Sequence, residues 1–450
     1  MNPALPEFPE VNIEKGLIEG VSIGRLVEGY GSPLFIFSER VIKQKVSELR
    51  NALQRYYPNS QIAYSLKANY LPAILDTLRK EHIWAEAESE FEYWLSKKLG
   101  FSDNEIIFNA VDKEEDTLFA ALSNGAVVNV GNFPELERIG KFTLASDKSA
   151  SIGLQINLRV GSRYPSRHGF ELDTGEAHEA VILLNKKFSN VHVRGLHVHL
   201  GPYIENIESY TLAAEQLSDF AIELKKDFDI NIMYLDMRSG FLVPGARPFG
   251  REIWVVSEIG EYVKEIAAVL DRKFPDEKPR LYIEPGKFLV DEAGVLLTTA
   301  RDVKITTLHP EQTKRGVFLR ARDGARGDEA KLQMVNVDAS MNSVLPTAPL
   351  RHHRVHAIST HRTFGKEQFA SIVGGNSSML NDFLAWDITL PQVFAGDHLL
   401  FYNAGAYELY YSRGSSPRPA AIMVHSDKRV TRMQRRESFE HLVTLDEFRV

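Results

Sequence analysis

The sequence predicts an α/β protein: a (β/α)8 barrel followed by a second, mostly β domain. Three observations support this prediction. Eight short apolar runs alternate with helix-like segments, polar residues stand at the ends of these runs, and helical periodicity becomes scarce after Glu284. Alternating strands and helices form parallel βα units, and eight such units over about 250 residues match a closed barrel better than an open sheet.

The eight runs each carry the apolar or β-branched residues expected of a short buried strand. They are Gln61–Lys67, His82–Ala87, Glu105–Val111, Ala126–Gly131, Gly153–Val160, Val193–Leu200, Ile230–Met237 and Arg280–Glu284. We therefore expect residues 46–295 to form the barrel.

Short alternating runs with turn signals follow the barrel segment. They are Gly316–Leu319, Met334–Val337, His398–Phe401 and Ala421–Val424. An earlier strand-like run, Leu34–Phe37, precedes the barrel. We expect residues 1–45 plus 296–450 to form a β-rich domain that includes this N-terminal strand.

A polar residue lies at or just past the end of each barrel run. These residues are Lys67, Glu86, Asn109, Asn129, Arg159, His199, Arg238 and Glu284. Active sites of barrels lie at the carboxyl ends of the strands, so this pattern predicts where the chemistry occurs. Lys67 is the most informative of them, because a neutral lysine amine is a nucleophile that can bind a carbonyl cofactor as a Schiff base. The alternative is a surface lysine in a strand–helix loop.

Composition excludes several classes of function. The formal net charge of -7 gives no electrostatic footprint for nucleic acid. The chain has no cysteine, which excludes disulfides, thiolate metal sites and a cysteine nucleophile. The N-terminal segment lacks the basic and apolar regions of a secretory signal, and no apolar stretch is long enough to span a bilayer. We expect a cytoplasmic protein with no membrane partner.

Five motifs, in this order and spacing, resemble those of the fold-type III pyridoxal-phosphate (PLP) decarboxylases, the diaminopimelate and ornithine decarboxylase family. They are Ala63–Asn69, Gly195–Gly201, Ile283–Lys287, Val337–Asn342 and Ala404–Tyr407. The chain resembles a divergent member of that family over nearly its whole length. The resemblance implies the alanine racemase-like architecture of barrel plus β domain, PLP as the cofactor, and a homodimer with shared active sites.

The resemblance also implies roles for the main site residues. Lys67 would hold PLP as an internal aldimine, His199 would stack on its ring, and Glu284 would face the pyridine nitrogen. A carboxylate there keeps the nitrogen protonated, so the ring can accept the electron pair left when a Cα bond breaks. Barrel racemases of this fold type place an arginine at that position, which disfavours the quinonoid. Glu284 therefore favours decarboxylation over racemisation.

Further cofactor-binding residues follow from strand-end positions and from the resemblance. They are Glu86, Arg159, Arg238, Ser239, Gly240, Gly286, Lys287 and Tyr407. The phosphate needs backbone N–H groups, which the family supplies from a triple glycine; this chain has Arg238-Ser239-Gly240, so only Gly240 of the three glycines is retained. Either side chain could contact the phosphate, or the segment could be a structural turn. Tyr407 resembles a tyrosine that contacts phosphate and substrate; it could also be a core aromatic.

The substrate-binding residues depart most from the family. A Cys–Glu pair, contributed across the family's dimer interface, corresponds here to Ser378 and Met379, and an arginine that clamps a distal carboxylate corresponds to Pro346. A serine hydroxyl is a far weaker acid than a thiol. Diaminopimelate is therefore not the expected substrate, and Arg351 could bind an acidic or amide-linked side chain, although a solvated basic turn is the alternative.

Metal binding is not predicted. His197 and His199 lie two residues apart and so share one face of a strand, but the sequence shows no third ligand at a suitable spacing. The function that the sequence predicts is decarboxylation of an amino acid or its derivative. The alternatives are a PLP-dependent racemase-type enzyme and a non-catalytic PLP-binding protein.

Overall fold

A computed structural model of the chain describes residues 9–160, 167–201, 204, 206–238, 240–241, 243, 247–248, 256–307, 331–348, 351–411 and 416–445. The contacts divide the chain into two compact units. The barrel unit comprises Lys43–Leu242 and Val256–Leu289. The β unit comprises Met1–Ile42, Val243–Val255 and Val290–Val450.

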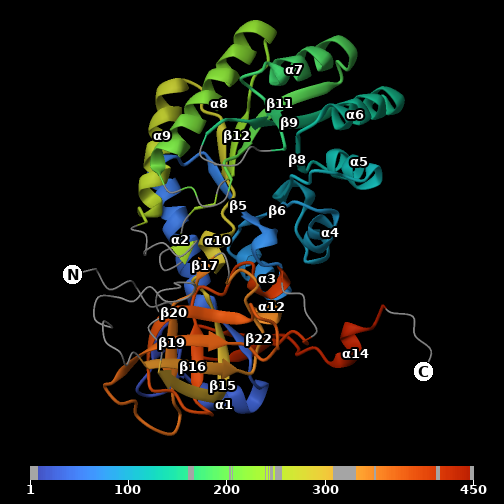
Figure 1. The fold of residues 1–450 in the computed structure, drawn as a ribbon. Helices are drawn as coiled ribbons and strands as arrows, with labels where there is room; N and C mark the ends of the chain where they lie inside the picture. The colour runs from blue at the N-terminus through green and yellow to red at the C-terminus, as the bar shows by residue number, and fades with distance from the viewer. Residues whose placement is uncertain are drawn as a thin grey trace. The chain divides into compact units, whose positions relative to one another are not determined.

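The barrel unit contains the eight parallel strands that the sequence predicted, and the sheet closes through pairing of β8 with β9 (Figure 1). They are β5 (Ser60–Ser65), β6 (Trp84–Ala87), β7 (Ile106–Phe108), β8 (Val127–Val130), β9 (Ala150–Asn157), β11 (Val191–His199), β12 (Tyr234–Arg238) and β14 (Arg280–Ile283). A short strand, β10 (Phe170–Glu171), adds to β9. The (β/α)8 barrel with a separate β domain is thus confirmed.

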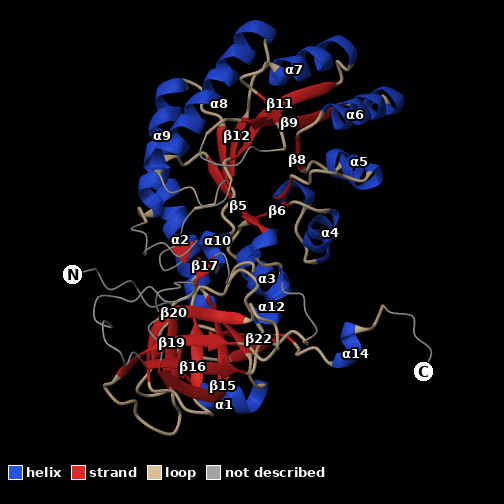
Figure 2. Cartoon of the chain, viewed as in Figure 1, coloured by secondary structure: helices blue, strands red, loops and turns tan. Residues whose placement is uncertain are grey.

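Helices lie outside the ring of strands (Figure 2). They are α2 (Glu39–Tyr56), α3 (Pro72–Lys80), α4 (Glu90–Lys98), α5 (Glu115–Ser123), α6 (Phe133–Ser146), α7 (Glu176–Lys187), α8 (Ile207–Phe228), α9 (Ile259–Lys273) and α10 (Lys287–Val290). Local sequence fixes several starts, because Ser89, Asn132 and Asn206 each accept a hydrogen bond from the backbone N–H three residues later. None of the helices in the described part of the chain has the length and apolar composition of a membrane span.

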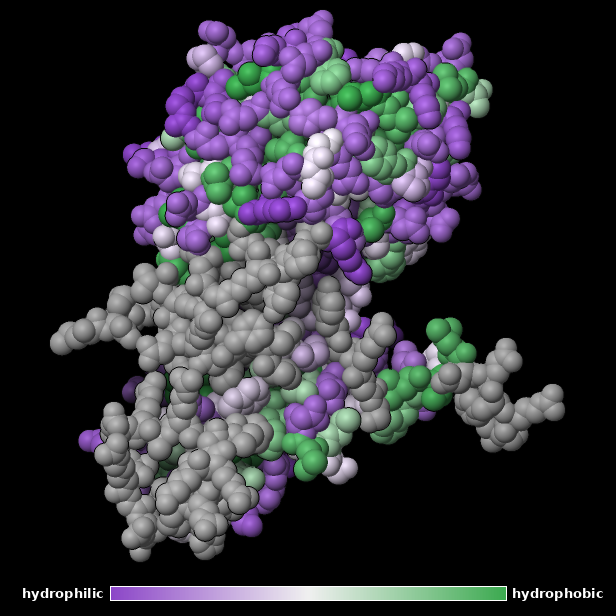
Figure 3. All heavy atoms as spheres, turned by 45° about the horizontal axis from the view of Figure 1, so that its top comes forward, coloured by the Kyte–Doolittle hydropathy of each residue, from purple (hydrophilic) through white to green (hydrophobic). Residues whose placement is uncertain are grey.

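Aromatic and small side chains fill the barrel below the strand ends. Tyr234 and Tyr282 pack with Ala63 and Ile107 in one buried cluster. A Cβ atom on Gly195 would lie 2.0 Å from the ring of Tyr234, so only glycine leaves room for that ring. The Tyr234 hydroxyl donates to Asn129 Oδ1 at 3.1 Å. Tyr234 thus connects this apolar cluster to the polar residues at the strand ends. On the face of this unit visible in Figure 3, hydrophilic residues predominate.

The β unit is built around a second, nine-stranded sheet. Its strands are β4 (Leu34–Ser38), β15 (Gly294–Thr307), β16 (Lys331–Val337), β18 (Val355–Ile358), β19 (Gln368–Gly374), β20 (Phe383–Pro391), β21 (His398–Phe401), β22 (Ala420–Val424) and β23 (Val430–Gln434). The N-terminal strand β4 pairs antiparallel with β15 and parallel with β22, and so belongs to this sheet. The predicted run Gly316–Leu319 lies outside the described residues.

Smaller elements complete the β unit. They are β1 (Val11–Asn12), β2 (Leu17–Ile18), β3 (Val21–Ser22), α1 (Ile23–Tyr30), β13 (Arg247–Pro248), β17 (Arg351–His352), α12 (Met341–Val344), α13 (Glu408–Tyr411) and α14 (Phe439–Leu442). β13 pairs with β17. It thus belongs to the β unit, although the sequence placed it within the barrel range.

Candidate active site

Polar and charged side chains converge at the carboxyl ends of the barrel strands. Lys67 lies in a 3-10 turn (Leu66–Ala68) directly after β5, and Glu284 follows β14. The others come from β6 to β12 or from the residues that follow them: Glu86, Glu88, Asn109, Asn129, His197, His199, Asp236 and Arg238. Parallel strands end on one side of a barrel, which is why residues distant in sequence meet here.

Arg238 is the central cation of this cluster. Its side chain is 5% exposed, and its guanidinium lies 2.5 Å from Glu88 Oε1, 3.5 Å from Glu86 Oε1 and 3.6 Å from Glu284 Oε2. Burial of a charge is costly unless it is paired, and here three carboxylates pair with one guanidinium. Arg238 therefore points into the barrel and neutralises acids from two other strand ends.

Glu88 links Arg238 to Lys67. Glu88 Oε2 lies 2.9 Å from Lys67 Nζ, and both side chains are 25% exposed. Burial acts to raise the pKa of Glu88, but Arg238 and Lys67 outweigh it, so the pKa is lowered from its usual value and Glu88 is ionised. Glu88 was not among the residues predicted from the sequence, because Glu86 was taken as the polar residue at the end of this run. Residues two apart leave a strand on the same face, and that spacing could have identified Glu88.

Deeper in the barrel, two asparagines bind two carboxyl groups. Asn109 Nδ2 donates to Glu284 Oε1 at 2.8 Å, and Asn129 Nδ2 donates to Asp236 Oδ2 at 2.8 Å. Burial, together with Asp236 and Glu86, raises the pKa of Glu284 well above its ordinary value. Burial is also the main cause that raises the pKa of Asp236 to about 7. Both carboxyl groups therefore keep their protons to a higher pH than an exposed carboxyl group does.

Two neutral histidines border the same space. Burial and Arg238 lower the pKa of His197 well below its ordinary value and lower the pKa of His199 to about 2. Among the described residues, neither ring nitrogen of His197 has a hydrogen-bond partner. His199 lies at the end of β11 and is partly exposed. Both imidazoles are uncharged at neutral pH.

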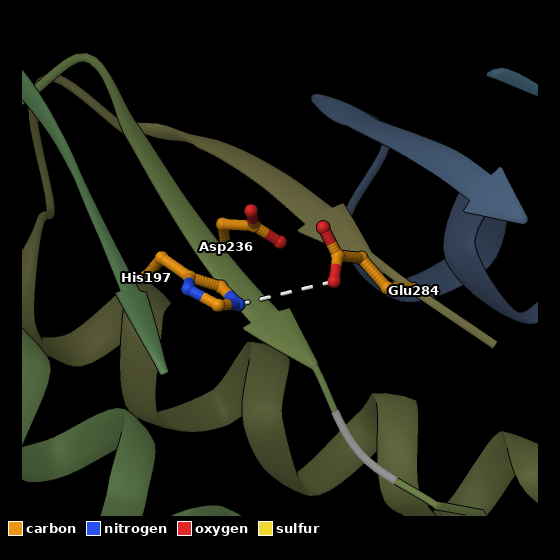
Figure 4. Close-up of side chains that lie close together, drawn as sticks. All are labelled: His197, Asp236 and Glu284. Atoms are coloured by element: carbon orange, nitrogen blue, oxygen red, sulfur yellow. Dashed lines mark ion pairs between the residues drawn. The ribbon is translucent and has the colours of Figure 1, made fainter. Parts of the chain in front are cut away.

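His197, Asp236 and Glu284 point toward one another from three different strand ends (Figure 4). His197 Nε2 lies 3.9 Å from Glu284 Oε2, and one ligand atom from each of the three lies within 4.8 Å of the others. Asp236 and Glu284 come from β12 and from the end of β14, so the spacing of residues in the sequence did not show that they lie beside His197. That the protein binds no metal stays a prediction.

Other barrel residues selected from the sequence lie apart from the cluster or close to its edge. Arg159 is 70% exposed and pairs with Asp173 at 3.6 Å and Glu171 at 4.0 Å, so the structure does not bring it to the cluster. Gly240 N donates to Gly201 O. Ser239 lies outside the described residues.

Gly286 and Lys287 follow Glu284 at the end of β14. A Cβ atom on Gly286 would lie 3.0 Å from Ala68 Cβ, so a small residue is needed where this loop passes the Lys67 turn. Lys287 is buried at the start of α10. Their roles in cofactor binding stay predictions.

The candidates of the β unit are described within that unit. Ser378 and Met379 lie in the loop between β19 and β20, which Asp382 anchors by accepting bonds from Met341 N at 2.6 Å and Ser377 N at 2.9 Å. Tyr407 has a left-handed φ of 71°. Arg351 lies in β17, of which the backbone alone is described.

Glu92 binds the backbone of Glu88, and its raised pKa can be tested by measuring stability against pH. Its carboxylate accepts a bond from Glu88 N at 2.6 Å, and burial is the main cause that raises its pKa to about 8 from 4.5. Between these values the folded protein keeps a proton that the unfolded chain has lost. Glu92 thus stabilises the fold fully below pH 4.5, and its contribution falls as the pH rises toward 8, by up to about 1.4 kcal/mol per pH unit.

We expect Glu92→Gln to flatten the decline in the free energy of unfolding between about pH 5 and 8, because glutamine does not titrate. Urea unfolding of the cofactor-free protein across this range measures the slope. Glu90→Gln, on the same helix, is the control, since Glu90 accepts a bond from Glu114 N away from the cluster. Equal slopes for wild type and Glu92→Gln would contradict the raised pKa.

The chain is similar to known proteins in both sequence and fold. A family model described as the pyridoxal-binding domain of pyridoxal-dependent decarboxylases matches residues 40–291. A diaminopimelate decarboxylase of Methanothermobacter thermautotrophicus is 26% identical, with 97% of each chain covered. Another, from Aquifex aeolicus, is 27% identical, with 95% of this chain and 94% of the relative covered. A crystal structure of the diaminopimelate decarboxylase of M. jannaschii with L-lysine aligns at a TM-score of 0.83 and 23% identity over 98% of both chains.

Proposed function

The chain belongs to the family of pyridoxal-dependent decarboxylases, and from this premise we propose that Lys67 binds the aldehyde of PLP and that the substrate is an amino acid or derivative other than diaminopimelate. The family assignment makes the protein a PLP-dependent carboxy-lyase acting on an amino acid. The observation that supports the proposed site is the convergence of Lys67, His199 and Glu284 on one end of the barrel.

The residues present fit PLP. Lys67 offers a partly exposed primary amine at the barrel mouth. Glu284 Oε2 is buried and, among the described residues, has no hydrogen-bond partner. This is expected if its partner is the ring nitrogen of PLP. Bound PLP supplies an electron-accepting ring that takes up the electron pair left at Cα when the carboxyl group leaves as carbon dioxide.

The protein's own groups have distinct tasks in this proposal. Glu284 would hold the ring nitrogen through a hydrogen bond from its buried carboxyl group, whose pKa is raised by burial and by Asp236. Asn109 fixes the Glu284 carboxyl group through its hydrogen bond. His199 is uncharged, which suits an imidazole that stacks on an aromatic ring. The proton that Cα needs after decarboxylation is proposed to come from Lys67, from Tyr407 or from a water held by Ser378.

We propose a homodimer in which the loop with Ser378 and Met379 completes the partner's site. Met379 is 58% exposed and Leu380 is 95% exposed. Apolar side chains at a loop tip are better explained if another chain covers them. Met379 and Pro346 also lack the charges that would bind the ammonium and carboxylate at the far end of diaminopimelate, which is the reason to propose another substrate. Cytoplasmic location and the absence of nucleic-acid binding remain predictions.

Diaminopimelate is the second candidate substrate, because several full-length relatives are named diaminopimelate decarboxylase. The deciding experiment measures carbon dioxide release with PLP present from meso-diaminopimelate, the standard amino acids and their acylated derivatives. We expect release from at least one of the latter and about tenfold less or none from meso-diaminopimelate, since each lost charged contact costs about 1.5–3 kcal/mol.

Two outcomes would change the proposal. Diaminopimelate as the best substrate would overturn the substrate assignment and keep the enzyme class. Chiral analysis of recovered substrate in heavy water tests the racemase alternative. Racemisation without carbon dioxide release would support that alternative, and no turnover of any compound would support a non-catalytic PLP-binding protein.

A further inference from the structure

Lys67 and Glu88 occupy equivalent positions just past the ends of the adjacent strands β5 and β6. Ser65 of β5 is paired with Glu86 of β6 in the parallel register, and Lys67 and Glu88 each lie two residues further along. Both residues therefore follow their strands at the same level of the barrel, and Lys67 Nζ lies 2.9 Å from Glu88 Oε2. The register of the two strands, rather than a flexible surface contact, brings them together.

Arg238 fixes the other oxygen of Glu88. Two strands, β14 and β5, separate β12 from β6 in the barrel, so the Arg238 side chain reaches across the strand ends where Glu284 and Lys67 emerge. Of its three carboxylate partners, Glu88 is the nearest, at 2.5 Å, against 3.5 Å for Glu86 and 3.6 Å for Glu284. Both oxygens of Glu88 are thus engaged, one by a fixed guanidinium and one by the amine of Lys67.

We propose that Glu88, held by Arg238, is a positioning residue that orients Lys67 and controls the pH at which its amine can bind a carbonyl compound. This inference rests on the proposed role of Lys67. A carboxylate next to an ammonium favours the charged amine, which is not a nucleophile. When the Lys67 ammonium loses a proton to water, the Nζ–H bond breaks, the water takes up the proton, and the amine retains its electron pair.

Glu86 does not serve this purpose. It is fully buried, its carboxylate accepts a bond from Asn109 at 3.2 Å, and burial raises its pKa. Glu88 instead has a lowered pKa and a partly exposed side chain, so it is ionised and can exchange protons with water. Lys113 and Glu135 form a buried lysine–carboxylate pair in this unit; they are 0% and 1% exposed and lie outside the site.

The test measures how fast the purified, cofactor-free protein takes up PLP, from the rise of visible absorbance, at a series of pH values. This readout does not require turnover. We expect Glu88→Gln to move the midpoint of the pH–rate profile down by about one pH unit or more, because loss of a nearby anion favours the neutral amine. Glu88→Asp, which keeps the charge, should restore most of the wild-type midpoint.

Glu90→Gln is the matched control, because Glu90 is two residues away and bonds to Glu114 N rather than to Lys67. It should leave the midpoint unchanged. An unchanged midpoint in Glu88→Gln, with far-UV circular dichroism equal to wild type, would overturn the proposal for Glu88. Wild-type protein that develops no visible band at any pH would instead overturn the proposed role of Lys67, so the two failures are distinguishable.

Discussion

Lys67→Ala is expected to remove the visible absorption band that PLP produces with the wild-type protein and to lower turnover by about 10³-fold or more. The amine of Lys67 is the partly exposed one at the barrel mouth, 2.9 Å from Glu88. Lys113 cannot replace it, because Lys113 is fully buried and donates to Ala110 O, Asn129 O and Glu135. Alanine keeps the short turn after β5 and removes the nucleophile.

Spectra recorded between about 300 and 500 nm during PLP titration, with carbon dioxide release measured in parallel, check this expectation. Lys80→Ala is the control: Lys80 is 67% exposed, at the end of the helix that follows the Lys67 turn. It should titrate like wild type. A visible band of normal intensity in Lys67→Ala would show that another amine binds the cofactor and would reject the site.

The sequence predicted the barrel well because each strand has a local pattern that its neighbours do not alter. All eight apolar runs became strands, and the structure differs mainly at their ends. The run that starts at Ile230 forms a strand only from Tyr234. Before it, Asp229 adopts a left-handed conformation that ends α8, and Ile230 N still bonds to Leu224 O of that helix. The apolar residues just after the end of α8 therefore looked, in the sequence, like the start of a strand.

The site was harder to predict, since its geometry depends on which strand ends face each other. Sequence position brought Lys67, Glu86, His199 and Glu284 to the correct end of the barrel. It could not show that Arg238 reaches Glu88 across two strands, because that contact depends on barrel closure. Arg159 met the same criterion of a polar residue at a strand end and yet pairs with surface acids. A strand-end position therefore selects candidates without giving the direction of a side chain.

Arg238 stands where the family's triple-glycine motif would have a glycine. Where the resemblance leads one to expect glycine, this chain has a buried cation that contacts Glu284, the acid expected to face the ring nitrogen. The acids around it have opposite tendencies: Glu88 is held ionised, whereas burial raises the pKa values of Glu86, Asp236 and Glu284. Arg238 lowers the pKa of each of these four acids, and burial is outweighed, by Arg238 and Lys67 together, only at Glu88.

Arg238→Met is therefore expected to destabilise the cofactor-free protein by about 3–5 kcal/mol near pH 8, because it leaves buried carboxylates without a cation. The loss should be smaller near pH 5, where Asp236, with a pKa of about 7, and the other acids with raised pKa values take up protons. Urea unfolding at the two pH values measures both. Arg159→Met, which removes a 70% exposed arginine from the same barrel, should cost only about 0–1 kcal/mol.

The double variant Arg238→Met/Glu88→Gln tests whether the effect is electrostatic. Removing the carboxylate nearest to Arg238 along with the guanidinium should recover part of the lost stability, since the pair shares one contact at 2.5 Å and its two substitutions should not be additive. Additive losses in the double variant, or equal losses at both pH values, would mean that Arg238 stabilises the barrel through packing of its side chain. In that case the charge balance among the four acids would not depend on it, and the order in which they titrate would have to come from burial and the asparagine hydrogen bonds.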